Sequence, residues 1–552
     1  MNLIKGCFKM TFEQYIAGMS TRELVGQLLC PAVRLGVSDT ADPREYFDVS
    51  FKDPTVKTGS VFFWGGSDKD LYEMVDRLKE RMGHMPLIAM DMETSPGALE
   101  GGMGFGSAMS ISAANSTEDA YACGEACARI GLEHGVTWSF GPAIDINYNP
   151  KNPIMNTRCW GDSPECVSKF TTAFINGMQE NGMIATAKHF PGDGMDDRDQ
   201  HLCTTINSLS MDEWRATYGK VWKAAIDNGL RAVMPGHIAL PAYEKDHAVR
   251  PATLSSALLQ DLLRGELGFD GLIVSDGMNM GGLAPHVTVE EGLIGLVKAG
   301  VDVLLFVNFW TDVSHAVDVL EDAVNRGEIT LDRVKESVYR IWKEKERLGI
   351  FDEENTMLFK ACPQEKKDEF KAVAERITRN SLTIAKNDKG VLPLDEGKTK
   401  RVISVDVSNL TRKVDNKLDA VMREKGIEVI KYGDDTENGF VRWFDLPEAD
   451  ALIVNFYYSS NWGANDIAPC GEKLQRVYEY FFRPEMPVVV VCHGNPFIPF
   501  TFPYMKTVVN TYTPNDPNPE ALYNVIFGLE EAKGVSPVRW PDEEFVYDKD
   551  YR

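Results

Sequence analysis

Short apolar runs alternate with longer amphipathic stretches over roughly the first 350 residues. The runs have the length of buried strands, and the stretches have helical spacing. The expected strands are residues 59–65, 86–91, 136–145, 183–190, 231–238, 271–276 and 301–307, and the expected helices include residues 118–133, 166–181, 211–228 and 289–299. Seven or eight such units indicate a parallel sheet and favour a (β/α)₈ barrel. An open doubly wound sheet is the alternative, but no GxGxxG phosphate loop supports it.

A second α/β region follows an irregular segment at residues 351–364. A helix from about Lys366 is expected to lead into residues 381–385, and five strands are expected at residues 401–407, 428–432, 451–456, 487–492 and 507–511. This pattern suits a smaller α/β sandwich. We therefore predict a (β/α)₈ catalytic barrel over residues 1–352, a linker over 353–370 and the sandwich domain over 371–552.

Polar side chains close or follow the expected barrel strands. They are Asp91, Asp145, Lys188, His189, His237 and Asp276. A (β/α)₈ barrel gathers the carboxyl ends of its strands around one mouth, where active sites lie. The sequence therefore predicts an active site built from several strands.

Composition narrows the range of partners. The net charge of -24 disfavours nucleic acid and anionic membranes, whereas it leaves a small neutral carbohydrate open as substrate. Neither a signal peptide nor an apolar stretch of spanning length is recognised, and the ten cysteines form no CxxC pair. We predict a cytoplasmic enzyme with no cofactor and no metal, and we leave a homo-oligomer open.

The first chemical motif is KHFPGDG at residues 188–194, followed by MDDRDQH at 195–201. In an extended loop, residues two apart project to the same side, so Asp199 can hold one nitrogen of His201 and leave the other to move a proton. Two other interpretations compete: a solvated surface pair, or a divalent metal site with Asp193, Asp196 or Asp197.

The second motif is GFDGLIVSDGMNM at residues 268–280. An apolar strand ends at Ser275-Asp276, which places a carboxylate at the expected barrel mouth. A glycosidase uses such a carboxylate to attack the anomeric carbon. The competing interpretation is an N-cap for the next helix.

Together these motifs resemble glycoside hydrolase family 3. The segments NTRCWGDSP at 156–164, PAIDIN at 142–147, AKNDKGVLPL at 385–394 and the tail through VRWP at 538–541 also fit. The KHFPG form with a downstream DxH is similar to the β-N-acetylglucosaminidase branch. That resemblance implies Asp276 as nucleophile, His201 as acid/base and Asp199 as its partner. It also implies sugar binding by Asp91, Arg158, Lys188 and His189, and a place for His237 near the site.

Two departures from the branch stand out. Asp193 occupies a position where the branch usually has histidine, and the segment after Asp91 lacks the usual arginine. These departures affect subsite preference rather than the core chemistry.

Three functional hypotheses remain open. The first is a retaining exo-β-N-acetylhexosaminidase, hydrolytic or with phosphate as acceptor. The second is a β-glucosidase or β-xylosidase whose acid/base is a second-domain glutamate, with Glu472 as a candidate. The third is an inactive sugar-binding protein, against which the intact Asp276, Asp199 and His201 argue.

Overall fold

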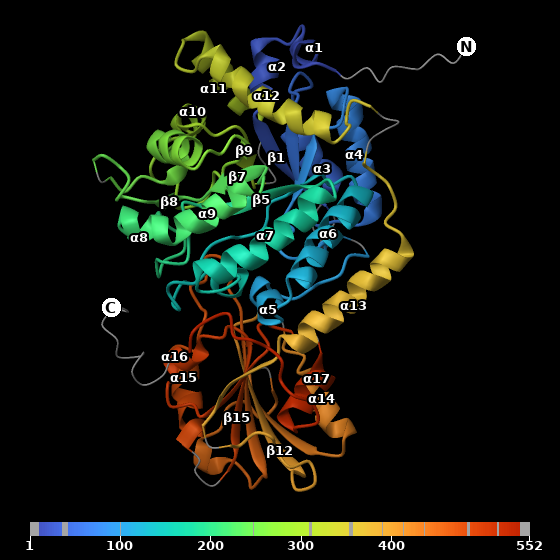
Figure 1. The fold of residues 1–552 in the computed structure, drawn as a ribbon, viewed down its shortest axis with the longest axis vertical. Helices are drawn as coiled ribbons and strands as arrows, with labels where there is room; N and C mark the ends of the chain where they lie inside the picture. The colour runs from blue at the N-terminus through green and yellow to red at the C-terminus, as the bar shows by residue number, and fades with distance from the viewer. Residues whose placement is uncertain are drawn as a thin grey trace.

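The computed structural model describes residues 10–35, 42–99, 101–246, 248–308, 312–352, 357–388, 390–411, 413–434, 436–482, 486–515 and 518–540. It contains two large sheets, one in each of two parts of the chain, and a third sheet of two short parallel strands, β6 Thr205–Ile206 and β8 Ile238–Ala239 (Figure 1). The first sheet lies within residues 29–306 and the second within residues 383–510. The helix α13, Gln364–Asn380, lies between them and crosses residue 370, the predicted start of the second domain. The exact domain boundaries stay predictions, and residues 353–356 of the predicted linker lie outside the described residues.

The first sheet is a closed parallel barrel. Its strands are β1 Leu29–Arg34, β2 Ser60–Trp64, β3 Leu87–Met90, β4 Trp138–Ser139, β5 Ile184–Phe190, β7 Ala232–Pro235, β9 Leu272–Ile273 and β10 Leu304–Phe306. They pair in the order β10-β1-β2-β3-β4-β5-β7-β9, and all of these pairs are parallel. A bridge between Val274 and Val303 joins β9 to β10 and closes the ring. The predicted (β/α)₈ architecture is therefore confirmed.

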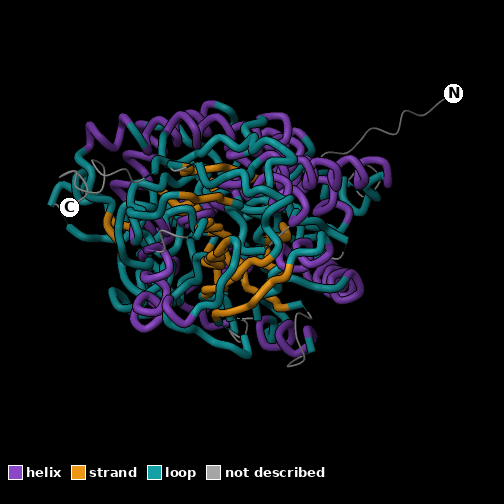
Figure 2. The backbone as a smooth tube through the Cα atoms, turned by 90° about the horizontal axis from the view of Figure 1, so that it is seen from below, coloured by secondary structure: helices purple, strands orange, loops and turns teal. Residues whose placement is uncertain are grey.

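Helices cover the outside of this barrel. They are α3 Pro43–Ser50, α4 Asp68–Met82, α6 Thr117–Glu133, α7 Pro164–Glu180, α8 Met211–Ala216, α9 Tyr218–Asp227, the π-helix η3 Ala257–Glu266, α10 Val289–Ala299, α11 Ser314–Asn325 and α12 Leu331–Arg347. Shorter helices are α1 Phe12–Ile16, α2 Thr21–Gly26 and α5 Ala108–Ala113. Figure 2 shows the helices toward the outside and the strands inside. Most of these helices begin at a Ser, Thr or Asp cap, as in α4, where Ser67 accepts from the Asp70 N–H group.

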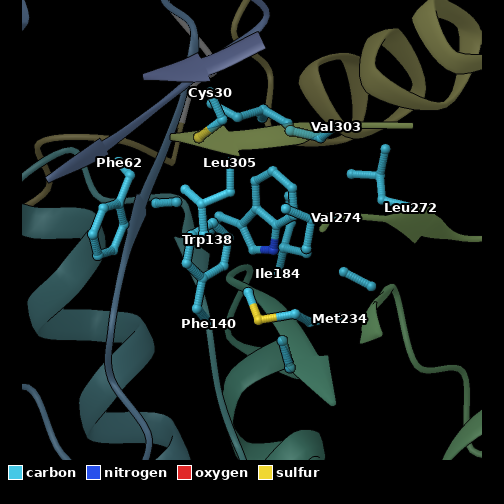
Figure 3. Close-up of a cluster of buried hydrophobic side chains, with 14 of the residues drawn as sticks. Cys30, Phe62, Trp138, Phe140, Ile184, Met234, Leu272, Val274, Val303 and Leu305 are labelled. Atoms are coloured by element: carbon cyan, nitrogen blue, oxygen red, sulfur yellow. The ribbon is translucent and has the colours of Figure 1, made fainter. Parts of the chain in front are cut away.

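The barrel interior is filled with side chains. Figure 3 shows this core, in which Trp138 of β4 lies near side chains from other parts of the barrel, such as Ile184, Val274 and Leu305. Their exposed fractions are at most 3%. The Trp138 indole N–H donates to Thr186 Oγ1 at 2.6 Å, which satisfies the polar atom of this large buried ring. Because the barrel is packed rather than open, a ligand has access only at its mouth.

The second sheet has six strands, β11 Thr383–Asn387, β12 Arg401–Ser408, β13 Glu428–Gly433, β14 Ala451–Tyr458, β15 Val488–Gly494 and β16 Thr507–Asn510. The order is β11-β16-β15-β14-β12-β13, with only β11 antiparallel to its neighbour. Alternate residues pack on opposite faces, for example Ile453 on one face and Val454 on the other. The helices α14 Lys417–Glu424 and α17 Pro519–Ile526 accompany one core cluster, while α15 Gly471–Val477 and α16 Ile498–Thr501 accompany the other. This is the predicted α/β sandwich.

No helix within the described ranges is long and apolar enough to cross a membrane. The cytoplasmic location stays a prediction. All nine cysteines in the described part of the chain are free thiols.

A buried lysine gives the barrel a testable pH dependence. Lys345 of α12 is fully buried, and its ammonium donates to the Tyr15 hydroxyl at 3.3 Å. Burial lowers the pKa of Lys345 to about 7. The unfolded chain therefore binds a proton between pH 7 and the ordinary value of 10.5 that the folded chain does not.

We expect Lys345→Met to stabilise the protein most below pH 7, where the wild-type protein buries a charge. As the pH rises from 7 toward 10.5, the difference in the free energy of unfolding between Lys345→Met and the wild-type protein should shrink by up to about 1.4 kcal/mol per pH unit. Chemical denaturation across this range measures it, with the exposed Lys398→Met as control. An advantage that does not change with pH would show that Lys345 is not neutral in the folded protein at high pH.

Candidate active site

The residues singled out from the sequence lie around one end of the barrel. Asp91 follows β3, Lys188 and His189 lie in β5, and Asp276 closely follows β9. The strands β3 and β9 end shortly before Asp91 and Asp276, and β5 carries Lys188 and His189 just before its last residue. Parallel strands bring these ends to the same edge.

A cluster of alternating charges lies beside Asp91. The Lys188 ammonium is 3.2 Å from Asp91 Oδ1 and 2.7 Å from Glu93 Oε1. Arg158 contacts the same Glu93 through two nitrogens, at 3.0 and 2.7 Å. The Lys188 side chain is 6% exposed, whereas that of Asp91 is 43% exposed. The Asp91 carboxylate is therefore more accessible to a ligand than the Lys188 ammonium. Such a set of fixed donors and acceptors suits sugar hydroxyl groups.

Glu93 holds this cluster together, and it was not predicted as a site residue. Burial alone would raise its pKa, but the charges of Arg158 and Lys188 hold the pKa of Glu93 well below its ordinary value. It is therefore an anion between two cations. The sequence contained a signal for it, because Glu93 lies two residues after Asp91 and the intervening Met92 is buried.

His189 is fixed by Asp145. The ring nitrogen Nδ1 lies 2.8 Å from Asp145 Oδ2, and the main-chain N–H of His189 donates to the same carboxylate at 3.1 Å. The Asp193 N–H donates to Asp145 Oδ1 at 2.6 Å. Since a carboxylate only accepts, Nδ1 of His189 carries the hydrogen and the ring orientation is set.

Asp199 and His201 form the expected pair. Asp199 Oδ1 is 2.6 Å from His201 Nδ1 and also accepts the His201 main-chain N–H at 2.9 Å. Burial raises the pKa of Asp199, but the His201 ring and the N–H groups that donate to the carboxylate bring it below its ordinary value. The Asp199 side chain is fully buried and that of His201 is 27% exposed. The pair thus presents Nε2 of a partly open imidazole, which contradicts the interpretation as a solvated surface pair.

The second domain completes this pair. The main-chain N–H of Gly463, in the loop after β14, donates to Asp199 Oδ2 at 2.7 Å. The ring of the neighbouring Trp462 lies 6.1 Å from the His201 ring, and its side chain is exposed. Neither residue was predicted. The only signal in the sequence was a tryptophan followed by glycine between two expected strands.

Asp276 follows β9 and accepts the N–H of Gly277 at 2.7 Å. Burial raises the pKa of Asp276, but the nearby His189, His237 and His201 rings and this N–H bring it below its ordinary value. Asp276 is therefore ionised at neutral pH, as a nucleophile requires. It is partly exposed and starts no helix, since the next one, α10, is capped by Thr288.

Two backbone hydrogen bonds join the loops that carry the two motifs. Gly281 N–H donates to the carbonyl of His201 at 2.8 Å, and Gly282 N–H donates to that of Gln200 at 3.1 Å. The segment behind Asp276 is thus attached to the segment that carries His201. This arrangement places a carboxylate and an imidazole together at the mouth.

His237 occupies a different place from the other predicted sugar ligands. Its ring is fully buried, with Nε2 donating to the Gly277 carbonyl at 2.9 Å and Nδ1 bonded to the Thr253 hydroxyl at 3.0 Å. Burial lowers the pKa of His237, in keeping with a neutral ring. Contact with a sugar would require one of these bonds to break. The geometry instead fits a residue that holds the turn after Asp276.

Two of the three carboxylates considered for a metal site, Asp193 and Asp196, are occupied by protein donors, and the third, Asp197, is exposed. Asp193 accepts from Gly194, Asn152 and Gln200, and Asp196 accepts from Arg198 and from the Ile206 N–H. The described residues contain no group of three or more His, Cys, Asp or Glu side chains suited to hold a metal ion.

Comparison with known proteins places these motifs in a family. Residues 22–343 match the model for the glycosyl hydrolase family 3 N-terminal domain. Over 545 residues, 95% of this chain and 94% of the relative, the chain is 30% identical to a β-N-acetylglucosaminidase/β-glucosidase of Cellulomonas fimi. It is also 37% identical over 171 residues to a β-hexosaminidase of Stenotrophomonas maltophilia, which covers 31% of this chain and 49% of that protein.

Among solved structures, the β-glucoside phosphorylase BglX bound to 2FGlc superimposes with a TM-score of 0.85 at 28% identity, covering 96% of each chain. The Paenibacillus sp. str. FPU-7 family 3 β-N-acetylglucosaminidase has the same fold, with a TM-score of 0.77 at 24% identity, covering 94% of this chain and 99% of that one. Together with the family match over the whole barrel, these relationships confirm the resemblance seen in the sequence: the chain belongs to glycoside hydrolase family 3 and is a glycoside hydrolase.

Proposed function

We propose that this glycoside hydrolase releases terminal β-linked N-acetylhexosamine residues by a double displacement, with Asp276 as nucleophile and His201 as acid/base. The observation that carries the proposal is the Asp199–His201 pair, fixed by a second-domain N–H and attached to the loop of Asp276. A carboxylate alone at a barrel mouth suits many reactions. A carboxylate next to an oriented imidazole suits glycosyl transfer through a covalent intermediate.

In the first step, the Asp276 carboxylate attacks the anomeric carbon while the bond to the glycosidic oxygen breaks. His201, in its protonated form, donates the Nε2 proton to that oxygen, and the aglycone leaves as a neutral alcohol. Asp199 accepts from Nδ1 and stabilises the cationic ring. The products are a glycosyl ester on Asp276 and a neutral imidazole.

In the second step, the neutral His201 removes a proton from the acceptor as the acceptor attacks the anomeric carbon. The ester bond to Asp276 breaks, and the carboxylate is regenerated. With water as acceptor the product is a free sugar, and with phosphate it is a sugar 1-phosphate. A neutral imidazole does not repel an anion as a carboxylate base would, so phosphate is a feasible acceptor.

A β-glucoside substrate is the second candidate. Two observations favour it: the Cellulomonas fimi relative carries both activities in its name, and the BglX neighbour is a β-glucoside phosphorylase. A glutamate acid/base from the second domain has less support. Glu472 accepts from Arg476 one turn along α15 and is 76% exposed, while the second-domain residues at the pair are Trp462 and Gly463.

The deciding experiment is a panel of nitrophenyl glycosides, with N-acetylglucosamine, glucose and xylose as the sugar, each assayed with and without phosphate. Our proposal predicts the highest kcat/KM for the N-acetylglucosaminide. Formation of sugar 1-phosphate identifies phosphate as acceptor. Preference for the glucoside selects the second candidate, and inactivity on every glycoside contradicts both.

Alanine changes in the charge cluster and at His189 should weaken sugar binding. We expect single substitutions of Asp91, Arg158, Lys188 and His189 to lower kcat/KM by tens- to thousands-fold, or about 1.5–4 kcal/mol, because each removes fixed donors or acceptors for the sugar. Lys220→Ala, which removes an exposed lysine of α9, serves as control. Unchanged kinetics in most of the four variants would place the sugar elsewhere.

A further inference from the structure

Asp193 is a further buried carboxylate, and it lies behind the loop that carries Asp199 and His201. Asp193 is 2% exposed, and its N–H donates to the buried Asp145. It belongs to the segment that leaves β5 and ends at the Asp199–His201 pair. The two catalytic steps do not use it, and the related branch usually has histidine there.

Both oxygens of the Asp193 carboxyl group face hydrogen-bond donors. Oδ1 accepts the Gly194 N–H at 2.6 Å and the Asn152 side-chain amide at 3.1 Å. Oδ2 accepts the Gln200 side-chain amide at 3.2 Å. Three donors converge on this carboxyl group, so it is bonded as a carboxylate.

The two amides cannot turn around to suit a protonated carboxyl group. The Asn152 oxygen accepts the N–H groups of Ile154 and Met155, at 3.1 and 2.7 Å. The Gln200 oxygen accepts the His237 N–H at 3.0 Å. Because main-chain N–H groups only donate, each amide must keep its oxygen toward them and its NH₂ group toward Asp193. If the Asp193 oxygen that faces Gln200 were protonated, its O–H group would point at the NH₂ group of Gln200. Both groups are donors, so the hydrogen bond between them would be lost.

Gln200 transmits this constraint to the catalytic loop. It lies between Asp199 and His201 in the chain, and it is 1% exposed. The main-chain carbonyl of Gln200 accepts the Gly282 N–H at 3.1 Å, so Gln200 also contacts the segment behind Asp276. Gln200 thus connects Asp193 and the segment after β7 through its side chain, and the segment behind Asp276 through its main chain.

We propose that Asp193 is a positioning residue for the acid/base pair, acting through Gln200, and that protonation of Asp193 loosens the loop that carries His201. This inference rests on the proposed role of His201. It concerns a residue that touches neither substrate nor reacting atoms.

The charges around Asp193 set the pH at which this occurs. Burial and the Asp145 charge raise the pKa of Asp193 to about 6, while His189 and the donors of Gly194 and Asn152 oppose the rise. Cys159 and Tyr218 also face it, and burial raises the pKa of both groups, so they stay neutral. Positioning is therefore present above pH 6 and is lost as the pH falls through it. Asp276 and Asp199, with lowered pKa values, stay ionised in this range.

The first test is the pH dependence of kcat/KM between about pH 4.5 and 8. The kcat/KM of the wild-type enzyme should fall below about pH 6. This acidic limb of the pH profile cannot come from Asp276, whose pKa lies below its ordinary value. Asp193→Asn should be lower by up to about 100-fold at neutral pH, since small displacements of a catalytic group have effects of this size, and it should lack that limb. Asp197→Asn, an exposed aspartate of the same loop, is the matched control and should behave as wild type.

A double-mutant cycle tests the route through Gln200. Gln200→Leu should also lower kcat/KM and remove the limb. If Asp193 acts through Gln200, the double variant Asp193→Asn/Gln200→Leu should be no worse than Gln200→Leu alone. Additive losses would contradict this route.

Hydrogen exchange gives a readout that does not require turnover. In the wild-type protein, exchange in residues 192–203, corrected for its intrinsic pH dependence, should speed up below about pH 6. In Asp193→Asn it should be fast throughout, and in Asp197→Asn it should follow wild type. An Asp193→Asn variant with the wild-type limb and exchange overturns the proposal.

Two further outcomes are separable. If wild type cleaves no glycoside, the proposed function fails, and the exchange data still decide whether Asp193 holds the loop. If Asp193→Asn does not fold, Gln200→Leu, which keeps Asp193, is measured by the same exchange and must show a loop that is loose at neutral pH.

Discussion

Asp276→Asn is expected to lower kcat by about 10⁴-fold or more, because no other carboxylate can replace the nucleophile of a covalent mechanism. The substitution keeps the size of the side chain and can keep the bond from Gly277 N–H. The loss would therefore reflect chemistry rather than folding. Steady-state kinetics on the best nitrophenyl glycoside measures it.

A 2-fluoro sugar with a good leaving group identifies the nucleophile directly. It should label the wild-type enzyme on Asp276, in a peptide identified by mass spectrometry. Asp270→Asn is a suitable control, since Asp270 lies in the same motif, is 81% exposed and pairs at 3.5 Å with Arg340. Labelling of another residue, or substantial activity in Asp276→Asn, would rule out the assignment.

His201→Ala is expected to affect substrates according to their leaving groups. A nitrophenolate leaves without protonation, so the first step should be slowed less for nitrophenyl glycosides than for a disaccharide. The second step still lacks its base, and the glycosyl ester on Asp276 should accumulate. General acid–base catalysis contributes about 10²–10⁴-fold, which sets the loss expected for the disaccharide.

Azide should restore part of the activity of His201→Ala, because this nucleophile can attack the glycosyl ester without a base to remove a proton from it. The product is a glycosyl azide, detectable by mass spectrometry. The exposed His315→Ala should show neither the leaving-group dependence nor the azide effect. If a variant of a second-domain glutamate shows both effects and His201→Ala shows neither, the glucosidase-type mechanism is correct.

Most of the fold could be predicted because buried strands leave a local signal. The runs around β2, β3, β5 and the strands β12 to β16 of the second domain agree with the structure to within a few residues, whereas β11 was not predicted as a strand. The first barrel strand, β1, was not predicted. Its sequence LCPAVR is an apolar run as long as several that were predicted, but it contains Pro31, and a proline argues against a central strand. Only pairing with β2 and β10 makes it a strand.

The predicted strand at residues 136–145 was too long. In the structure β4 covers only Trp138–Ser139, and the chain then continues as a loop with a single bridge from Ala143 to Lys188. The apolar residues of that loop are buried although they do not belong to a strand. A pattern of apolar positions reports burial and does not by itself report hydrogen bonding between strands.

The sequence by itself determined the family and the barrel, and it indicated candidate catalytic positions, since strand ends and the spacing of Asp199 and His201 are local properties of the chain. The tertiary structure alone decided what those residues contact. Glu93 contacts Arg158, which is 65 positions away in the sequence, and Gly463 contacts Asp199, which is 264 positions away. Every residue except proline has a main-chain N–H, so no residue type marks the one at Gly463 that holds Asp199. Only folding, which brings a loop of the second sheet over the barrel mouth, gives that common group its particular place.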